Sequence, residues 1–383
     1  MPSKLPLSYI ELSKKNLIHN IKEFRGLSKP GTKFMAVIKG NAYGHGQNLV
    51  AKILEPFVDY FQIDSIEELR KLRKVSKKKT FVLGYIQKDD LEEAIKLHCI
   101  LGVFSKEQLR KINKIAEKVS ARGGPALNWK QEIHIAVDAH LGREGFLRAE
   151  IPKVLREIKK CSNIKFSGIY AHFANIEDTE NFSHAQKQID EYREVLKLVE
   201  KFKLQTHISS TSGFLVYEKD TGAHSLVRLG IGIYGMWPAE HIKFLNKNKI
   251  ILKPILTWKT KVAQVKTLPE GHTIGYGLTF KTKRETKIAL IPQGYADGIP
   301  RALSNKGKVL IQGTRCKILG RVSMNMLTVD VSHLGRVKEG DAVVILGHQE
   351  RAEISAEEIA EDMGTINYEV TTRISALLPR IIV

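Results

Sequence analysis

The sequence lacks the features that mark secreted, membrane-spanning or disulfide-stabilised proteins. No apolar run is long enough to cross a bilayer, and the start, MPSKLPLSYIELSKK, has neither the hydrophobic segment nor the cleavage site of a signal peptide. The only cysteines are Cys99, Cys161 and Cys316, and their wide spacing argues against a disulfide framework or a structural zinc site. We therefore expect a reduced, cytoplasmic protein with no metal centre and no membrane partner.

Nucleic-acid-binding signatures are also missing, although the net charge of +20 would suit an anionic partner. We find no recognition helix, zinc finger or RNA-binding motif. In stretches such as LRKLRKVSKKKT the basic residues alternate with polar or apolar positions, as on an exposed helix face. We interpret the charge as a solvated cationic surface and expect no nucleic-acid partner. An anion- or nucleic-acid-binding protein is the alternative that charge alone supports.

The chain does contain regular alternation of strand-like and helix-like segments up to about residue 235. Repeated strand–helix units imply parallel strands with helical crossovers, and eight units over this length indicate an α/β fold of the (β/α)8, or TIM-barrel, type. A doubly wound open sheet is the runner-up. The predicted strands are 34–38, 58–63, 80–85, 99–104, 132–137, 164–171, 205–210 and 226–234.

The pattern of predicted secondary structure changes after residue 240. Short strand patterns such as KIALIP, KVLIQG and DAVVILG are joined by glycine turns, which predicts a second, mostly-β domain. This domain has one late predicted helix, in SAEEIAEDMG, with Ser355 as its N-cap and Gly364 as its stop. We therefore divide the chain into a barrel over 13–240 and a β domain over 241–383.

The stretch FMAVIKGNAYGHG places a lysine, Lys39, at the end of the first predicted strand. The carboxyl ends of barrel strands carry the chemistry of such folds. A lysine that is desolvated there has a lowered pKa and becomes a nucleophile or a base. The alternative is a lysine that extends from the strand end into solvent. The glycines after it, with Tyr43 and His45, favour a site.

This stretch is similar to the cofactor-lysine motif of the alanine racemases, and the resemblance continues along the chain. The further motifs, in the order found in that family, are VDAHLGREGF, GIYAHFANIED, HISSTSG, VRLGIGIYG, GYGLTF, GYADGIPR, GRVSMNM and TINYEVTTRI. The resemblance implies a barrel followed by a β domain, which residues 1–12 would join. It also implies pyridoxal 5'-phosphate as cofactor and a homodimer whose active sites combine both subunits.

The resemblance also assigns roles to residues. Lys39 would bind the cofactor and act as the base towards D-alanine, while Tyr276 would be the base towards L-alanine. His172 would contact Tyr276, and Arg228 would contact His172 and face the cofactor ring. Arg143 and the backbone of Met324 would bind the substrate carboxylate. The phosphate would be bound by Tyr43, Ser210, Thr211, Gly230, Ile231 and Tyr368.

Within these motifs, GIGIYG satisfies the G-x-G-x-x-G pattern of dinucleotide-binding folds. That interpretation requires a helix that opens inside the motif. We expect instead that the strand continues through Ile231 and Ile233, and that this last barrel segment holds a phosphate through its amides.

Several positions depart from the family pattern near Arg143. The lysine, often carbamylated, that usually stands two residues before Asp138 is Ala136, and Arg143 thereby loses a partner. An anion, another side chain or water would have to compensate. Ser210, Asn325, Ala139 and His140 also differ from the usual residues. We expect an alanine racemase that supplies D-alanine for peptidoglycan; the alternatives are a broad-specificity amino-acid racemase and a pyridoxal-phosphate decarboxylase of the same barrel class.

Overall fold

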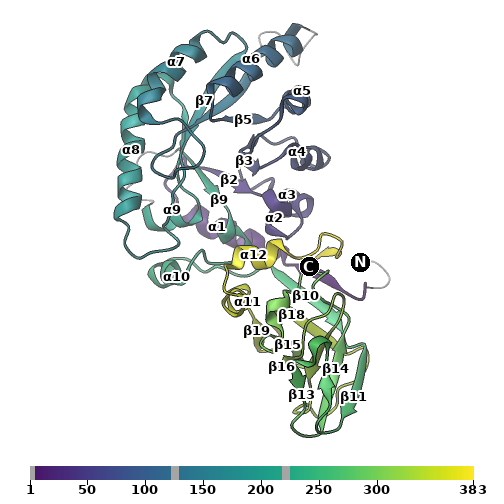
Figure 1. The fold of residues 1–383 in the computed structure, drawn as a ribbon. Coiled ribbons are helices and arrows are strands. Elements are labelled where there is room, and N and C mark those ends of the chain that lie inside the picture. Colours follow the sequence, from purple (N-terminus) through teal and green to yellow (C-terminus); the bar gives the residue numbers. More distant parts are fainter. Residues whose placement is uncertain (1–4, 122–128, 218–224) are drawn as a thin grey trace. The chain divides into compact units, whose positions relative to one another are not determined.

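The computed structural model describes residues 5–121, 129–217 and 225–383, which form two compact units (Figure 1). We call the first the barrel unit; it consists of the described parts of Ile18–Gly40 and Gln47–Leu252. We call the second the β unit; it consists of the described residues up to Leu17, Asn41–Gly46 and Lys253–Val383. Each unit is described by itself.

Eight parallel strands form the sheet of the barrel unit. Neighbours follow the order β8-β7-β6-β5-β4-β3-β2-β9, and every pair is parallel. The strands are β2 (Lys33–Val37), β3 (Tyr60–Ile63), β4 (Thr80–Val82), β5 (Ile100–Val103), β6 (Gln131–Ala136), β7 (Ile164–Tyr170), β8 (Gln205–His207) and β9 (Leu226–Leu229).

The two edges of this sheet meet through backbone hydrogen bonds beside β8 and β9. The amide of Ser225 donates to the carbonyl of Thr206 at 3.0 Å, and the amide of Arg228 donates to the carbonyl of Ser209 at 3.1 Å. Joining the edges closes a barrel and leaves no open strand edge. The predicted (β/α)8 fold class is confirmed, and the open-sheet alternative is wrong.

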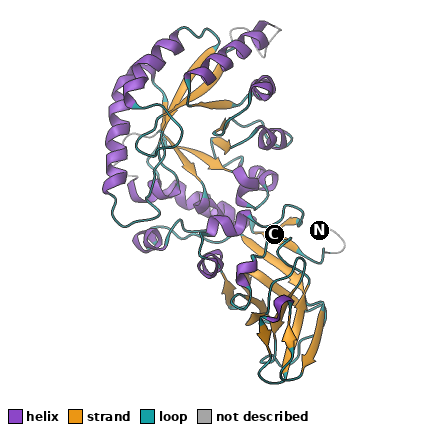
Figure 2. Ribbon diagram, in the orientation of Figure 1, coloured by secondary structure: helices purple, strands orange, loops and turns teal. Residues whose placement is uncertain are grey.

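Helices lie outside the strands of the barrel unit (Figure 2). Their inner faces are apolar, as α7 shows with buried Ile151, Val154 and Ile158 at spacings of three and four. The helices are α1 (Lys14–Leu27), α3 (Gln47–Leu54), α4 (Ile66–Arg73), α5 (Leu91–Lys96), α6 (Lys106–Ala121), α7 (Ile151–Lys159), α8 (Ser183–Val199), α9 (Thr211–Tyr217) and α10 (Glu240–Asn246).

The β unit is a ten-stranded sheet with a separate two-stranded ribbon, β12–β13. β1 pairs antiparallel with β10 and parallel with β20, so the start and the end of the chain belong to one sheet. The strands are β1 (Tyr9–Leu12), β10 (Leu256–Lys261), β11 (Gln264–Leu268), β12 (Thr273–Ile274), β13 (Phe280–Lys281), β14 (Thr286–Ile291), β15 (Lys308–Ile311), β16 (Thr314–Leu319), β17 (Leu327–Asp330), β18 (Ala342–Gln349), β19 (Ala352–Ile354) and β20 (Arg380–Ile382).

Two helices, not one, occur late in this unit. α11 (Ala356–Met363) is the predicted helix: the Ser355 side chain accepts from the amide of Glu358, and Gly364 ends the helix with φ of 70°. The prediction of a single helix is wrong, because α12 (Asn367–Thr372) follows. It has only six residues, several of them β-branched, and such a segment carries little helical signal in the sequence.

Candidate functional site

Lys39 stands at the carboxyl end of β2, where the backbone turns left-handed. The short helix α2 (Lys39–Tyr43) has φ between 53° and 59° at each residue from Gly40 to Tyr43. Left-handed backbone costs roughly 1–2 kcal/mol for each residue that carries a Cβ, so Asn41, Ala42 and Tyr43 store strain. Strain of this kind persists only where the surroundings enforce it, and it is concentrated at functional sites.

Contacts within the β unit hold the far side of this turn. The ring Nδ1 of His45 donates to the carbonyls of Ala42 and Tyr43 at 3.0 and 2.9 Å. Arg380 donates to the carbonyl of Gly44 at 2.9 Å. A Cβ on Gly44 would lie 1.9 Å from the carbonyl oxygen of Thr371, so only glycine fits there.

Contacts within the barrel unit hold the near side, around Lys39. Its ammonium lies 3.7 Å from a carboxylate oxygen of Asp64, and its side chain is 39% exposed. The Glu68 carboxylate accepts from the amide of Gly40 at 2.6 Å and from that of Asp64 at 2.8 Å. The amine is therefore half-exposed and positioned from the ends of two neighbouring strands, rather than fully buried.

Arg228, on β9, is buried, and both terminal nitrogens of its guanidinium are hydrogen-bonded. Nη1 donates to Nδ1 of His207 at 2.7 Å, and Nη2 donates to the carbonyl of Ala171 at 2.7 Å and to Nδ1 of His172 at 3.1 Å. Burial lowers the pKa of Arg228 to about 10, which still leaves the group charged at neutral pH.

Two further histidines continue the network into the barrel interior. His207 Nδ1 accepts from Arg228, so its proton lies on Nε2 and is donated to Nδ1 of His134 at 2.8 Å. Burial lowers the pKa of His134 to about 3 and, together with the charge of Arg228, holds that of His207 well below its usual value. Both rings are neutral. Sequence reasoning missed both residues, although HISSTSG contains His207.

His172, two residues after β7, has a defined tautomer. Burial and the charges of Arg228, Arg143 and Lys39 hold its pKa well below the usual value, so the ring is neutral. Arginine can only donate, so Nδ1 of His172 accepts and Nε2 carries the proton. His172 thus offers an N–H donor at its other edge.

The predicted phosphate residues of the barrel unit lie on two neighbouring loops. Ser210 immediately precedes α9, and the hydroxyl of Thr211 accepts from the amides of Gly230 and Gly232 at 3.1 and 3.4 Å. The expectation that the strand continues through Ile233 is wrong: β9 ends at Leu229, and a single 3-10 turn, Ile231–Tyr234, follows. A Cβ on Gly232 would lie 2.5 Å from the ring of Phe24 and 2.7 Å from the side chain of Thr211, so the turn packs closely against both residues.

Four of the predicted residues, Tyr43, Tyr276, Met324 and Tyr368, belong to the β unit. The rings of Tyr43 and Tyr368 have centroids 5.9 Å apart. Tyr276 is 72% exposed in the turn Tyr276–Leu278, and Met324 is 56% exposed in the loop between β16 and β17. Tyr295 is also exposed, and its amide donates to the carbonyl of Ser323 at 3.0 Å. The β unit thus presents large apolar side chains on hydrogen-bonded loops.

Arg143 lies in the loop after β6 and pairs with its neighbour in sequence, Glu144. Nη2 donates to one carboxylate oxygen at 2.8 Å, and Nε donates to the other. The sequence left this partner open, and adjacent residues carry no periodic signal that would have identified the pair.

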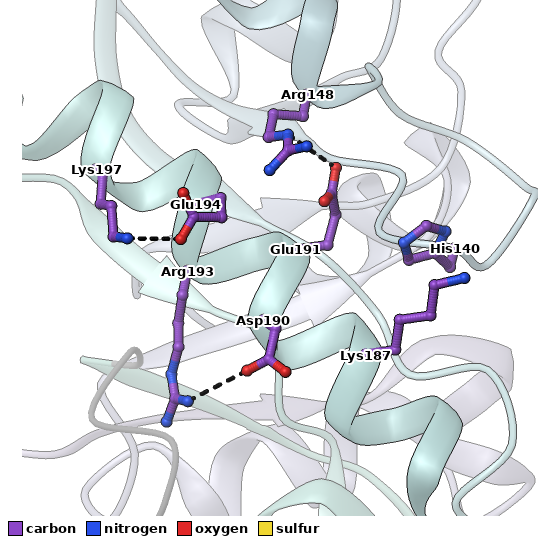
Figure 3. A pocket seen from close by; sticks show the side chains of 8 residues that line it. All are labelled: His140, Arg148, Lys187, Asp190, Glu191, Arg193, Glu194 and Lys197. Carbon is purple, nitrogen blue, oxygen red and sulfur yellow. Dashed lines mark hydrogen bonds and ion pairs between the residues drawn. The ribbon is translucent and has the colours of Figure 1, made fainter.

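A charged hollow elsewhere on the barrel unit offers different chemistry (Figure 3). It is lined mainly by α8, and its acidic side chains each contact a basic one: Asp190 with Arg193, Glu191 with Arg148 and Glu194 with Lys197. Exposed pairs of this kind neutralise each other and contribute little energy. We therefore assign the functional site to the strand ends around Lys39.

The described residues contain no cluster of histidine, cysteine, aspartate or glutamate side chains suited to a metal ion. Within the same residues, every helix is too short or too polar to cross a membrane. Cys99, Cys161 and Cys316 are free thiols.

Comparison with known proteins gives matches over both units. Residues 12–238 match the family model "Alanine racemase, N-terminal domain", and residues 255–382 match "Alanine racemase, C-terminal domain". The chain belongs to the alanine racemase family. This confirms the resemblance found in the motifs. The enzymes of this family use pyridoxal phosphate to interconvert L- and D-alanine. The chain is therefore an isomerase.

Individual members of the alanine racemase family are similar along their whole length. The alanine racemase of Desulforamulus reducens is 36% identical over 382 residues, which covers 97% of this chain and 98% of that protein. The solved alanine racemase of Clostridium difficile 630 has a TM-score of 0.91 at 30% identity, and covers 100% of this chain and 97% of its own. The Bacillus anthracis alanine racemase with bound L-Ala-P has a TM-score of 0.89 at 31% identity, over 99% and 96% of the two chains.

The residues of the barrel unit fit pyridoxal phosphate. Lys39 provides a half-exposed primary amine, Arg228 a buried cation, and Thr211 with the turn at Ile231 provides hydroxyl and amide groups suited to a phosphate. The hydroxyls of Ser209 and Tyr170 are buried without a hydrogen-bond partner among the described residues. Buried polar groups normally have a partner, so these two are consistent with a site that completes its contacts with a ligand.

Proposed function

We propose that the chain racemises alanine with pyridoxal phosphate at the barrel strand ends, using Lys39 and Tyr276 as bases on opposite faces of the substrate. When bound, pyridoxal phosphate withdraws electron density from the substrate and makes its α-proton acidic. The observation that carries the proposal is Lys39 at the end of the first barrel strand, in the same unit as the buried Arg228.

Lys39 binds the cofactor covalently and acts on D-alanine in this proposal. The amine must be accessible and must lose its proton to act as a base. The Glu68 carboxylate accepts from the amides of Gly40 and Asp64. These contacts fix the backbone next to Lys39 and the backbone of Asp64, whose carboxylate faces the amine. The strained turn that follows keeps the amine from moving with a flexible loop.

Tyr276 acts on L-alanine, and it requires a donor that stabilises its deprotonated oxygen, since a phenol has a pKa of about 10. His172 supplies that donor in our proposal, because its Nδ1 is engaged with Arg228 and its proton lies on Nε2. The permanent charge of Arg228 behind the ring strengthens the donor. The histidine positions and polarises the phenol; it does not itself abstract a proton.

Arg228 sets the electrostatics at the cofactor ring. It stays protonated at neutral pH, so it donates a hydrogen bond without transferring its proton. His207 and the carbonyls of Ala171 and Ile208 hold it in place, and its charge cannot rotate away. We propose that this limits the electron demand of the ring and returns the proton to the α-carbon rather than elsewhere.

Phosphate binding is assigned to Ser210, Thr211, Gly230 and Ile231 from the barrel unit, together with the hydroxyls of Tyr43 and Tyr368. Arg143 and the backbone N–H of Met324 bind the substrate carboxylate. The support is the position of each residue in the family motifs, together with the loop arrangement described above.

The exposure of Tyr276 and Met324 supports our proposal of a homodimer with composite sites. Large apolar groups exposed on adjoining loops mark an interaction surface. We propose that the second subunit's barrel covers them, so that each site takes its lysine from one subunit and its tyrosine from the other. We also propose a cytoplasmic location and a supply of D-alanine to peptidoglycan synthesis.

The test is racemisation itself. Purified protein with pyridoxal phosphate should convert L-alanine to a mixture of enantiomers, measured by chiral chromatography. Borohydride treatment should leave a pyridoxyl group on Lys39, detected by peptide mass spectrometry. A labelled lysine other than Lys39, or no label with no racemisation, would contradict the proposal.

A second candidate, broad-specificity racemisation, is favoured by the changes at Ala136, Ser210 and Asn325 near the substrate end of the site. A panel of L-amino acids distinguishes the two candidates: activity within tenfold of that on alanine for several longer side chains would support the broad enzyme.

A further inference from the structure

The loop after β6 holds Arg143 rigidly. The Asp138 carboxylate accepts from the amides of Leu141 and Gly142, each at 2.9 Å. The amide of Asp138 in turn donates to the carbonyl of Phe146 at 3.1 Å, which ties the far end of the loop back to β6. A Cβ on Gly145 would lie 2.5 Å from the amide nitrogen of Asp138. The two ends of the loop therefore approach each other so closely that only glycine fits at position 145.

This loop brings two neighbouring side chains together. Successive side chains of extended backbone point in opposite directions, yet Arg143 and Glu144 form a two-pronged ion pair. Paired hydrogen bonds between a guanidinium and a carboxylate fix the plane of the arginine as well as its position. Glu144 is only 20% exposed, whereas Arg143 is 53% exposed, so the carboxylate is the buried anchor and the arginine the accessible group.

The charge of Glu144 is secured by its surroundings. Burial opposes ionisation, but the hydrogen bonds from Arg143 and the charge of Arg228 lower the pKa of Glu144 below its usual value. The pKa of Arg143 is raised, first by its bonds to Glu144 and also by the charge of Asp64, the carboxylate next to Lys39. Arg143 therefore interacts with the same electrostatic network as the cofactor lysine.

The neighbouring strand end offers no alternative anion at the position where the family usually has a carbamylated lysine. Ala136 is buried in the barrel cluster with Tyr170, and its methyl group carries no charge. We propose that Glu144 is the built-in anionic partner that positions Arg143 for the substrate carboxylate, so that the enzyme requires neither carbon dioxide nor a bound halide for this purpose. The inference rests on the proposed racemase function and makes Glu144 a positioning residue, not a catalytic one.

The test compares wild-type holoenzyme with E144Q in buffers free of carbon dioxide and chloride. Arg143 binds the substrate carboxylate before and during reaction, so losing its orientation should raise KM for L-alanine about tenfold and change kcat little. Added chloride or formate should restore part of the loss in E144Q and leave the wild type unchanged. E144D, which keeps the charge on a shorter side chain, should give an intermediate KM and remain testable if E144Q folds poorly.

A matched control is E157Q, which breaks the Arg110–Glu157 pair between the outer helices α6 and α7. It should leave KM unchanged and show no response to chloride. An equal rise of KM in both variants would mean a general charge effect and would overturn the proposal. So would an unchanged KM in E144Q, or activation of the wild type several-fold by bicarbonate or chloride.

A readout without catalysis separates this inference from the proposed function. In the 15N NMR spectrum of arginine side chains, the Nε–H of Arg143 should be protected from solvent exchange in the wild type, and E144Q should remove that protection. If the protein does not racemise alanine but the protected signal is present, the function fails and the pair stands. If racemisation occurs and no protected signal depends on Glu144, the pair fails and the function stands.

Discussion

The barrel unit and the β unit differ in how they hold their candidate site residues. In the barrel unit, Arg228 is buried, His172 is partly buried, and the two are hydrogen-bonded to each other before any ligand binds. In the β unit, Tyr276 and Met324 lie exposed on loops. The barrel thus carries a preorganised electrostatic environment, while the groups of the β unit to which we assign reaction and substrate binding lie exposed in the single chain. This difference is what our composite-site proposal explains.

The largest expected effect comes from Tyr276→Phe. We expect racemisation to fall by about 10²–10⁴-fold, the usual value of a positioned acid–base group. Exchange of the α-proton of D-alanine with deuterated water should persist, because Lys39 serves that face, while exchange from L-alanine should be lost. Proton NMR measures both. Since the substitution keeps the ring and removes only one hydroxyl, the free energy of unfolding should stay within about 0.5 kcal/mol of the wild type. Equal, mild losses on both enantiomers would refute the two-base assignment.

Arg228→Leu, in contrast to Tyr276→Phe, should lower the stability of the folded state. Its removal leaves the acceptor on His207 and the carbonyls of Ala171 and Ile208 without their donor, which should cost about 3–5 kcal/mol of unfolding free energy. Urea denaturation measures the loss. Arg351→Leu, at an exposed arginine of the β unit, is the control and should stay within about 0.5 kcal/mol of the wild type.

Acid should weaken the barrel unit through its neutral histidines. The folded state holds the pKa of His134 at about 3, below the unfolded value of 6.5. The unfolded chain therefore takes up a proton first as pH falls, and stability present above pH 6.5 is lost progressively below it. Between pH 7.5 and 5 this histidine alone should contribute a loss of about 2 kcal/mol.

His134→Gln should reduce that pH dependence by a comparable amount in urea titrations at the two pH values. His272→Gln, at an exposed histidine of the β unit, should retain the full dependence. Identical slopes for wild type and His134→Gln would show that this buried ring does not govern the acid response.

The smallest effects should come from a matched pair of helix caps. Ser65 caps α4 beside Asp64 in the barrel unit, and Ser355 caps α11 in the β unit; each accepts from the amide three residues on. Replacing either by alanine should cost about 1 kcal/mol of stability. Only Ser65→Ala should also lower activity, because it loosens the segment that faces Lys39. Equal kinetic effects of the two variants would argue against that link.

The sequence was sufficient for the fold because hydrophobic periodicity is a local signal. All eight predicted barrel strands occur, and Ser355 and Gly364 bound their helix as expected. The prediction failed at the last strand, where β9 ends at Leu229 and the 3-10 turn that follows packs Gly232 closely against Phe24, a residue distant in the sequence. The left-handed turn after Lys39 likewise leads into contacts with residues distant in the sequence: Thr371 and Arg380 both contact Gly44.

The candidate site also contains residues that the sequence predicts and residues that it does not. Lys39 stands out in the sequence by its place at a strand end, and the structure positions it there beside Asp64. The chain from Arg228 through His207 to His134 combines residues of three strands, and no spacing in the sequence relates them. Glu144 is hidden for a different reason: its pairing with Arg143 depends on the backbone direction of one loop.

Complementation between two inactive variants tests the central claim most directly. Lys39→Ala and Tyr276→Phe chains, each with its own affinity tag, would be co-expressed and the mixed dimer purified through both tags. If each site takes its lysine from one subunit and its tyrosine from the other, one of the two sites in the mixed dimer is intact, and about half of the wild-type activity returns. A mixed dimer no more active than its parents would contradict the account.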